Sequence, residues 1–149
     1  MKEGRKCGTC VECCTALAVP ELEKAVGERC RHLVAPGKCG VYDSRPPSCR
    51  DYACGWLMGG LSSSERPDRV GFIVEAHPVD GAKEPSVVIR ETREGSSRRD
   101  RAMALIRKLE GSRVIFVIPT EGERRILGPV HLVSRVVAAA GDLLARGKP

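Results

Sequence analysis

The sequence predicts an α+β protein in which a cysteine-rich N-terminal segment precedes a small, mostly antiparallel sheet with two helices. All eight cysteines of the 149-residue chain lie between Cys7 and Cys54. Runs of β-branched residues and amphipathic stretches then follow in the order strand, strand, helix, strand, strand, helix, which is typical of this class. We divide the chain into a cysteine-cluster segment, residues 1–65, and an α+β module, residues 66–149. Whether the two pack as one unit is left open.

Turn signals dominate the cysteine-cluster segment, and regular elements there are expected to be short. Pro20, followed by acidic residues and an apolar pair four residues apart, predicts a helix over Pro20–Glu28. A second short helix is expected over Asp51–Leu57, ended by two glycines. The serine-rich stretch Leu61–Pro67 is the best candidate for a linker to the second part of the chain.

The α+β module carries the clear periodicities. Apolar residues at helical spacing predict amphipathic helices over Arg98–Leu109 and Pro129–Ala145, with both helices on one face of the sheet. The first two strands are expected to form a hairpin around the turn-rich stretch Pro78–Pro85. The four strands are expected at Val70–Ala76, Ser86–Thr92, Val114–Ile118 and Arg125–Leu127.

The charge balance gives weak information about partners. The net charge is +6: residues 1–65 hold nine basic and eight acidic side chains (+1), and the remainder holds 16 and 11 (+5). A basic surplus is compatible with nucleic acid, but both signs are interspersed, so a solvated surface is favoured and nucleic acid stays a weakly supported partner. Aromatic residues make up only 3% of the chain, too few for a stacking-type single-strand binder.

The distribution of apolar residues predicts a cytoplasmic protein. No apolar stretch approaches the roughly 20 residues of a membrane helix, so no membrane contact is expected. The first six residues run into Cys7 without the apolar region of a secretory signal. We therefore expect a reducing environment in which the thiols stay free to bind metal.

The spacing of the cysteines favours metal ligation. A two-residue gap lets two thiolates of a tight turn face one ion, so Cys7 and Cys10 make a good zinc knuckle. With Cys13 they also match the first three ligands of a ferredoxin-type iron–sulfur run. That run expects a fourth cysteine after three further residues, whereas Cys14 follows Cys13 at once. Adjacent side chains diverge, so these two are not expected to serve one ion equivalently, and the fourth ligand of any first site must be remote. The candidate metal ligands are Cys7, Cys10, Cys13, Cys14, Cys30, Cys39, Cys49 and Cys54.

Eight thiols allow several arrangements: two four-cysteine sites, one site with a reserve pair, or disulfides. Disulfides need an oxidising compartment, and one or two cysteines are compatible with simple packing in a core. Metal–thiolate bonds would also stabilise the fold of a segment that is poor in large apolar side chains. His32 is an alternative ligand for a site of three cysteines and one histidine, whereas His77 and His131 have no obvious partner and are expected to be structural or exposed.

The order of these residues resembles a known family. The CxxCxxCC pattern of Cys7–Cys14 is followed by another cysteine and then, within Lys38–Tyr52, by a Tyr-x-x-Arg-Pro-x-x-Cys-Arg element. This is similar to the CxxCxxCC cysteine-cluster family of zinc- or iron-chelating domains. The resemblance covers Cys7 to Cys54, one third of the chain. It implies metal chelation by these cysteines but no particular reaction, and the residues after Arg66 lie outside it.

Charged and aromatic neighbours of the cysteines are candidates for a supporting role. Arg45 and Arg50 suit cations that donate to the sulfurs of a net negative thiolate cluster, although Arg45 also fits a role in shaping its loop. Tyr42 is a candidate for shielding the site from water. No Ser–His–Asp arrangement, phosphate loop or dinucleotide fingerprint is present, so no catalytic residue is predicted.

The sequence thus predicts a cytosolic protein that chelates zinc or iron through its cysteines, with a protein partner left open. The first alternative is a 4Fe–4S redox protein or an accessory protein for a partner enzyme. The second alternative is a zinc-dependent nucleic-acid-binding module.

Overall fold

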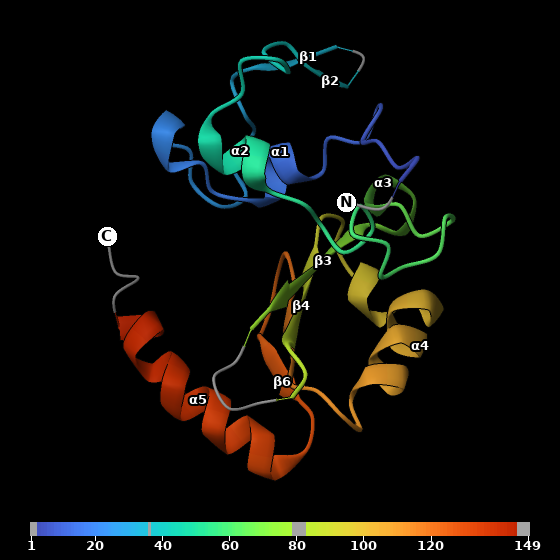
Figure 1. The fold of residues 1–149 in the computed structure, drawn as a ribbon, viewed down its shortest axis with the longest axis vertical. Helices are drawn as coiled ribbons and strands as arrows, with labels where there is room; N and C mark the ends of the chain where they lie inside the picture. The colour runs from blue at the N-terminus through green and yellow to red at the C-terminus, as the bar shows by residue number, and fades with distance from the viewer. Residues whose placement is uncertain (1–2, 36, 79–82, 146–149) are drawn as a thin grey trace.

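The structure, a computed structural model, describes residues 3–35, 37–78 and 83–145, with side chains described as far as residue 137. It is an α+β protein with a cysteine-rich N-terminal part set beside a four-stranded sheet (Figure 1). The N-terminal part holds α1 (Cys13–Ala16), η1 (Pro20–Leu22), β1 (Leu33–Val34), β2 (Lys38–Cys39) and α2 (Pro47–Asp51). The second part holds α3 (Pro67–Val70), β3 (Phe72–His77), β4 (Ser86–Glu91), η2 (Ser96–Arg98), α4 (Asp100–Leu109), β5 (Ile115–Ile118), β6 (Arg125–Leu127) and α5 (Val130–Ala145).

The sheet has the strand order β3-β4-β5-β6 and is mostly antiparallel, as predicted. The β3–β4 and β5–β6 pairs are antiparallel hairpin pairings, whereas β4 and β5 run parallel because α4 crosses between them. β3 begins later than predicted, at Phe72, because Val70 belongs to α3 and Gly71 ends that helix with a φ of 79°. Residues 79–82 of the predicted hairpin turn lie outside the described residues.

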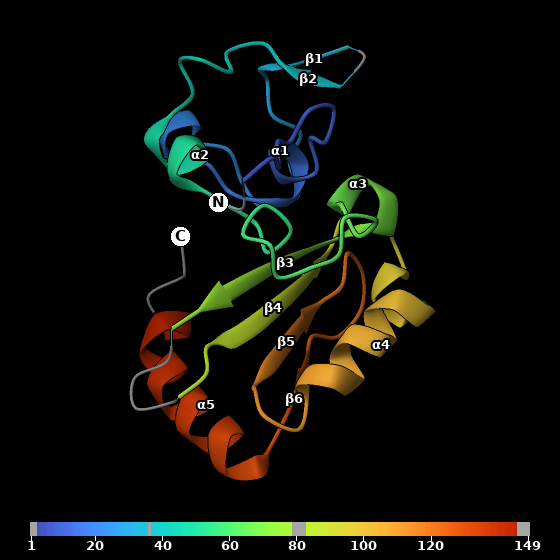
Figure 2. The same cartoon turned by 45° about the vertical axis from the view of Figure 1, so that its right-hand side comes forward.

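The two long helices flank the sheet from opposite sides, which corrects the prediction that both share one face (Figures 1 and 2). The side chains of Val87 and Ile89 in β4 and of Ile115 and Val117 in β5 are buried on the α4 side, where Ile106 packs. Alternation places Val88 and Phe116 on the other side of the sheet, and both are half-buried. Apolar residues on both faces need cover, so a single helical layer does not suffice.

The N-terminal part shares the core of the sheet. Trp56, Leu57 and Leu61 pack with Phe72 and Val74 in the same cluster of buried residues. The Arg5 guanidinium donates to the carbonyls of Trp56 and Leu61 and lies 5.0 Å from the Trp56 ring centroid. These contacts bind the start of the chain to the segment that leads into the sheet.

Both predicted helices of the N-terminal part are wrong in extent. The first is a single 3-10 turn over Pro20–Leu22, since Glu23 adopts a left-handed φ of 52° and Lys24 turns back to bridge Val19. The second lies earlier than predicted, over Pro47–Asp51, because Pro47 occupies a favourable first helical position. After it, Tyr52 is extended.

The stretch expected to be a linker is anchored at both ends. Leu61 is buried in the core cluster, and Pro67 is buried at the start of α3. Arg101 of α4 also donates to the carbonyl of Ser64 at 3.4 Å. Among the described helices, none combines the length and apolar character that crossing a membrane requires.

Candidate metal centre

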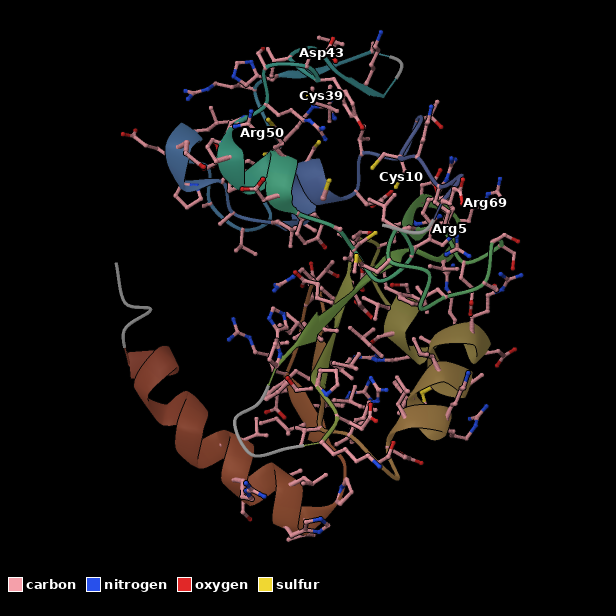
Figure 3. All side chains as sticks on the ribbon, viewed as in Figure 1. Arg5, Cys10, Cys39, Asp43, Arg50 and Arg69 are labelled. Carbon is pink, nitrogen blue, oxygen red and sulfur yellow. The ribbon has the colours of Figure 1, made fainter. Side chains whose placement is uncertain are left out.

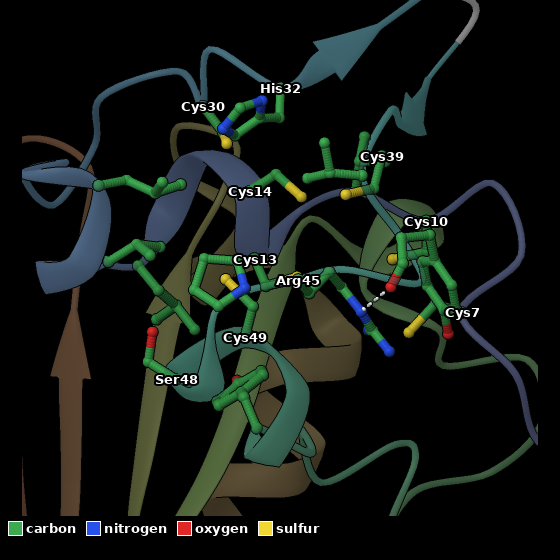
Figure 4. A pocket seen from close by; sticks show the side chains of 18 of the residues that line it. Cys7, Cys10, Cys13, Cys14, Cys30, His32, Cys39, Arg45, Ser48 and Cys49 are labelled. Carbon is green, nitrogen blue, oxygen red and sulfur yellow. Dashed lines mark hydrogen bonds between the residues drawn. The ribbon is translucent and has the colours of Figure 1, made fainter.

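Seven of the eight cysteines line one cavity in the N-terminal part (Figure 4). The cavity has a volume of about 130 Å³, and His32, Tyr42, Arg45 and Tyr52 also contribute to its wall. The seven thiols come from well-separated stretches of chain, and all eight cysteines are free rather than paired as disulfides. The cysteines that line the cavity are Cys7, Cys10, Cys13, Cys14, Cys30, Cys39 and Cys49.

The first four of these thiols are positioned by a turn and a one-turn helix. The amide of Cys10 donates to the carbonyl of Cys7 at 3.0 Å, which closes the predicted knuckle. α1 then begins at Cys13, so that Cys13 and Cys14 are adjacent residues at its start. Gly8 sits between the first two with a φ of 58°, a backbone conformation that favours glycine.

The remote thiols are brought to the cavity by loops and short strands. The amide of Cys30 donates to the carbonyl of Cys14 at 2.9 Å, which ties the loop after η1 directly to α1. Cys39 is paired with Leu33 across the β1–β2 hairpin, and the amide of Gly40 donates to the carbonyl of His32 at 2.8 Å. Cys49 is presented by α2.

Cys54 is the one predicted ligand that does not line the cavity. Its side chain is buried, with a relative exposure of 7%, and it belongs to the core cluster shared with the sheet. It still lies near the knuckle, since a charge on Cys54 is one of the causes that raise the pKa of Cys7. The sequence could not separate this cysteine from the others, because its spacing is equally compatible with ligation.

The cysteines surround the cavity without forming a ready ligand set. Among the residues that the structure describes, no three His, Cys, Asp or Glu side chains are grouped so that they could hold one metal ion. The donor chemistry nevertheless suits a thiophilic metal, because several sulfurs face a small space whose wall is mostly apolar.

The adjacent thiols of Cys13 and Cys14 differ in acidity. A hydrogen bond between them lowers the pKa of Cys14 to about 7 and raises that of Cys13 well above its ordinary value. Burial opposes the effect on Cys14, whereas the positive charges of Lys24 and Arg45 favour its thiolate. Burial raises the pKa values of Cys7, Cys10 and Cys49. Cys14 is thus the cavity thiol most readily ionised near neutral pH among those with a resolved shift.

The two arginines predicted to support the sulfurs differ in their position. The Arg45 guanidinium lines the cavity, its Nε donates to the carbonyl of Tyr42 at 2.7 Å, and its carbon lies 3.7 Å from the Tyr42 ring centroid. Arg45 therefore lies among the cysteines, and its bond to the Tyr42 carbonyl fits the alternative that it shapes its own loop. Arg50, predicted for the same role, is exposed on α2 and is not part of the cavity wall (Figure 3).

Lys24 is the cation that sequence reasoning missed. Its side chain is buried, with an exposure of 5%, and its ammonium donates to the carbonyls of Thr15, Leu17 and Ala25. It therefore holds the end of α1 and also lowers the pKa of Cys14. A lysine within the helix predicted over Pro20–Glu28 gave no sign of burial in the sequence.

Tyr52 was also missed as a residue of the cavity wall. Its hydroxyl is buried and has no hydrogen-bond partner among the described residues. Burial raises the pKa of Tyr52 far above its ordinary value, and charges on Glu75, Cys54 and Cys13 act in the same direction. Buried hydroxyls usually have a hydrogen-bond partner. The Tyr52 hydroxyl is therefore unusual, because it is a buried donor without an acceptor among the described residues.

The remaining candidates lie apart from the cavity. His77 ends β3 and His131 lies near the start of α5, and both are exposed, as expected. Comparisons with protein-family models, curated proteins and solved structures found no match to this chain. Membership of the CxxCxxCC family therefore remains a prediction from the motif in Cys7–Cys54.

Proposed function

We propose that this protein binds zinc or iron through cysteine thiolates in the N-terminal cavity. The observation that carries the proposal is the gathering of seven free thiols from separate stretches around one small space. Free cysteines of a structural kind are normally dispersed in a core as small apolar groups, and these are not. Zinc and iron both favour several thiolates in a space with limited access for water.

The surrounding charges support the same proposal. A site with four thiolates around a divalent ion carries a net charge of about −2. Arg45 lies at the cavity wall and Lys24 lies behind α1, and both lower the pKa of Cys14. Two fixed cations near the sulfurs would offset the negative charge, and hydrogen bonds to sulfur would strengthen the site.

Metal binding would also supply cohesion that the N-terminal part lacks. Its helices have four or five residues and its strands only two, too short to be stable by themselves. Bonds from thiolates to a metal would join the turn of Cys10, the loop of Cys30 and the helix α2, which carries Cys49. Metal affinity then contributes directly to the folding free energy of this part.

The experiment is anaerobic purification of the full chain followed by elemental analysis and an absorption spectrum. We expect zinc or iron bound to the wild-type protein in stoichiometric amount. A brown sample with absorbance near roughly 400 nm would assign an iron–sulfur cluster, and a colourless zinc protein would exclude it. A metal-free protein that takes up neither Zn²⁺ nor Fe²⁺ after reduction would overturn the proposal.

Cys49→Ser and Cys54→Ala form the matched pair for this experiment. Each variant removes one thiol, but only Cys49 lines the cavity. We expect Cys49→Ser to lose metal affinity by at least about a hundredfold, because loss of a group that only supports a ligand already costs up to that much, and Cys54→Ala to retain the wild-type metal content. Equal loss in both variants would show that the cavity does not define the ligand set.

A further inference from the structure

Exposed basic side chains gather over α4 and over the η2 turn that leads into it. None of them forms an ion pair with a carboxylate among the residues that the structure describes. Their positive charges are therefore not neutralised one by one within the fold. We name this group the basic surface, and it consists of Arg93, Arg98, Arg99, Arg101, Arg107 and Lys108.

The fold joins the basic surface to α3. The carbonyl of Gly71, at the end of α3, accepts hydrogen bonds from the amide of Arg93 at 3.1 Å and from the hydroxyl of Ser96. The Arg93 guanidinium donates in turn to the carbonyl of Asp68 in α3 at 2.7 Å. Arg69 of α3 is exposed as well and extends the positive charge beyond η2 (Figure 3). The cations of α3, η2 and α4 thus belong to one packed corner of the molecule.

Neighbouring carboxylates offset this charge only in part. Residues 65–71 and 92–110 together hold eight basic and five acidic side chains (+3), which is half of the net charge of +6. The exposed charged residues of α4 are one acidic and three basic, namely Asp100, Arg101, Arg107 and Lys108. The positive surplus of the chain is therefore concentrated in this corner.

The chemistry of the basic surface favours phosphate groups. Five of its six residues are arginines, and a guanidinium donates two parallel hydrogen bonds to phosphate oxygens. The remaining exposed residue of α4 is the small Ala104, which allows a phosphate backbone to approach the helix between the cations. The ten residues of α4 span about 15 Å, the length of about four phosphates along one strand of a duplex.

Other polyanions fit this surface less well. Single-stranded nucleic acid is bound by stacking on aromatic rings, and α3, η2 and α4 contain no aromatic residue. A membrane surface needs apolar side chains that enter the lipid, but the large apolar residues that are exposed in the described part of the chain lie outside these three elements. A duplex is therefore the partner that the surface suits best.

We propose that the basic surface binds the phosphate backbone of a double-stranded nucleic acid without reading its sequence. The chain contains neither Asn nor Gln, the side chains that recognise adenine in the major groove. Contacts to phosphates position a protein on a duplex but carry no sequence information. This binding is separate from the proposed metal site, because no residue of the basic surface lines the cysteine cavity.

The test is a fluorescence anisotropy titration of labelled DNA and RNA duplexes, each in two unrelated sequences, with the full chain as purified. At about 50 mM salt we expect a dissociation constant of about 10 μM or below for at least one kind of duplex, with less than about a threefold difference between its two sequences. With about three phosphates contacted, raising the salt to about 200 mM should weaken binding about fortyfold.

Two double variants with the same net charge decide whether the basic surface is responsible. Arg107→Ala combined with Lys108→Ala should weaken binding about tenfold and reduce the salt dependence by about two phosphate contacts. Lys38→Ala combined with Lys83→Ala removes two exposed charges from other parts of the chain and should stay within about twofold of wild type. Equal affinities of the two double variants would overturn the proposal.

A substitution at Ala104 tests the same surface without removing a cation. Because Ala104 is exposed, Ala104→Glu should leave the fold intact and weaken duplex binding about fivefold through repulsion of the phosphates, whereas the neutral Ala104→Gln should bind like wild type. Thermal unfolding of both variants checks that the fold is retained, and equal affinities of Ala104→Glu and Ala104→Gln would count against the surface.

Two further outcomes would overturn the proposal. The first is the absence of saturable binding to either kind of duplex at about 100 μM protein and about 50 mM salt. The second is tighter binding to phosphatidylserine vesicles than to both duplexes at equal phosphate concentration, which would assign the basic surface to a membrane.

Discussion

The two parts of this protein are stabilised in different ways. In the sheet, Phe72, Ile89 and Ile115 are almost wholly inaccessible to solvent and form a continuous apolar core with α4. Around the cysteines of residues 7–49, a buried cation, short turns and a cavity of thiols take the place of such a core, whereas Trp56, Leu57 and Leu61 belong to the core of the sheet. The cysteine-rich part is therefore held by hydrogen bonds and by the proposed metal bonds, whereas the sheet is held by burial of apolar side chains.

The largest expected effect is that metal removal opens the N-terminal part and leaves the sheet intact. We expect a chelator to lower the free energy of opening of the amides of Cys30 and Gly40 by about 5 kcal/mol, because metal–thiolate bonds contribute to folding. The amides of Val88 and Ile89 should keep their protection. Hydrogen exchange followed by NMR, with and without chelator, measures the protection of the amides in both parts. Equal loss of protection in the two parts, or no loss in either, would contradict the distinction between them.

Ile89→Ala should act on the sheet. Ile89 has no exposed surface, so truncation leaves a cavity and should lower the free energy of unfolding by about 3 kcal/mol. Urea unfolding of the metal-loaded protein measures the change. Val130→Ala, at a position that is 81% exposed, is the control and should change stability by less than about 0.5 kcal/mol; similar losses in both variants would contradict a core at Ile89.

Lys24→Met should act on the N-terminal part when wild type and variant are compared at saturating metal, because Lys24 also favours the Cys14 thiolate. The substitution leaves the carbonyls of Thr15, Leu17 and Ala25 without their donor, and it should lower local stability by about 2 kcal/mol. Exchange of the Cys30 amide is a suitable measure. Arg31→Met, which removes one exposed hydrogen bond to Leu22, should have little effect, and an equally small effect of Lys24→Met would contradict its structural role.

Glu91→Gln should make the free energy of unfolding depend less strongly on pH in the acid range. Burial alone would raise the pKa of Glu91, but hydrogen bonds from Ser97, Thr120 and Gly95 lower it below its ordinary value. The contribution of this carboxylate is therefore complete above the unfolded pKa, about 4.3, and is lost as pH falls through the lower folded pKa.

We expect Glu91→Gln to lose about 1.5 kcal/mol at neutral pH and to differ less from wild type at acid pH. Urea unfolding across the acid range measures this difference. A difference in the free energy of unfolding between variant and wild type that is the same at every pH would show that the pKa of Glu91 does not change on folding.

Tyr52→Phe should have the smallest effect and the opposite sign. Its hydroxyl is buried without a partner, so its removal should stabilise the metal-free protein by about 1 kcal/mol. Thermal unfolding of metal-free wild type and variant tests this expectation. A lower melting temperature for Tyr52→Phe would mean that the hydroxyl makes a stabilising bond.

The sequence was informative where one periodicity extended over a whole element. The helix Asp100–Leu109 and the strands around Ile89 and Val117 follow the apolar pattern closely. Pro20–Glu28 failed because its pattern covered scarcely two turns, and Lys24 was drawn inward to carbonyls that only the folded chain brings together. The strand order could not be derived either, since the parallel β4–β5 pairing depends on the path of α4 over the sheet.

The sequence by itself determined the α+β class, the order of the main elements and the concentration of thiols in the first third of the chain. Only the tertiary structure decided that seven cysteines share one cavity while Cys54 joins the core, and that Lys24 and Tyr52 stand beside them. The physical reason is that periodicity records which residues avoid water along one element. The meeting of distant loops depends on hydrogen bonds and packing between elements, and no local pattern records those contacts.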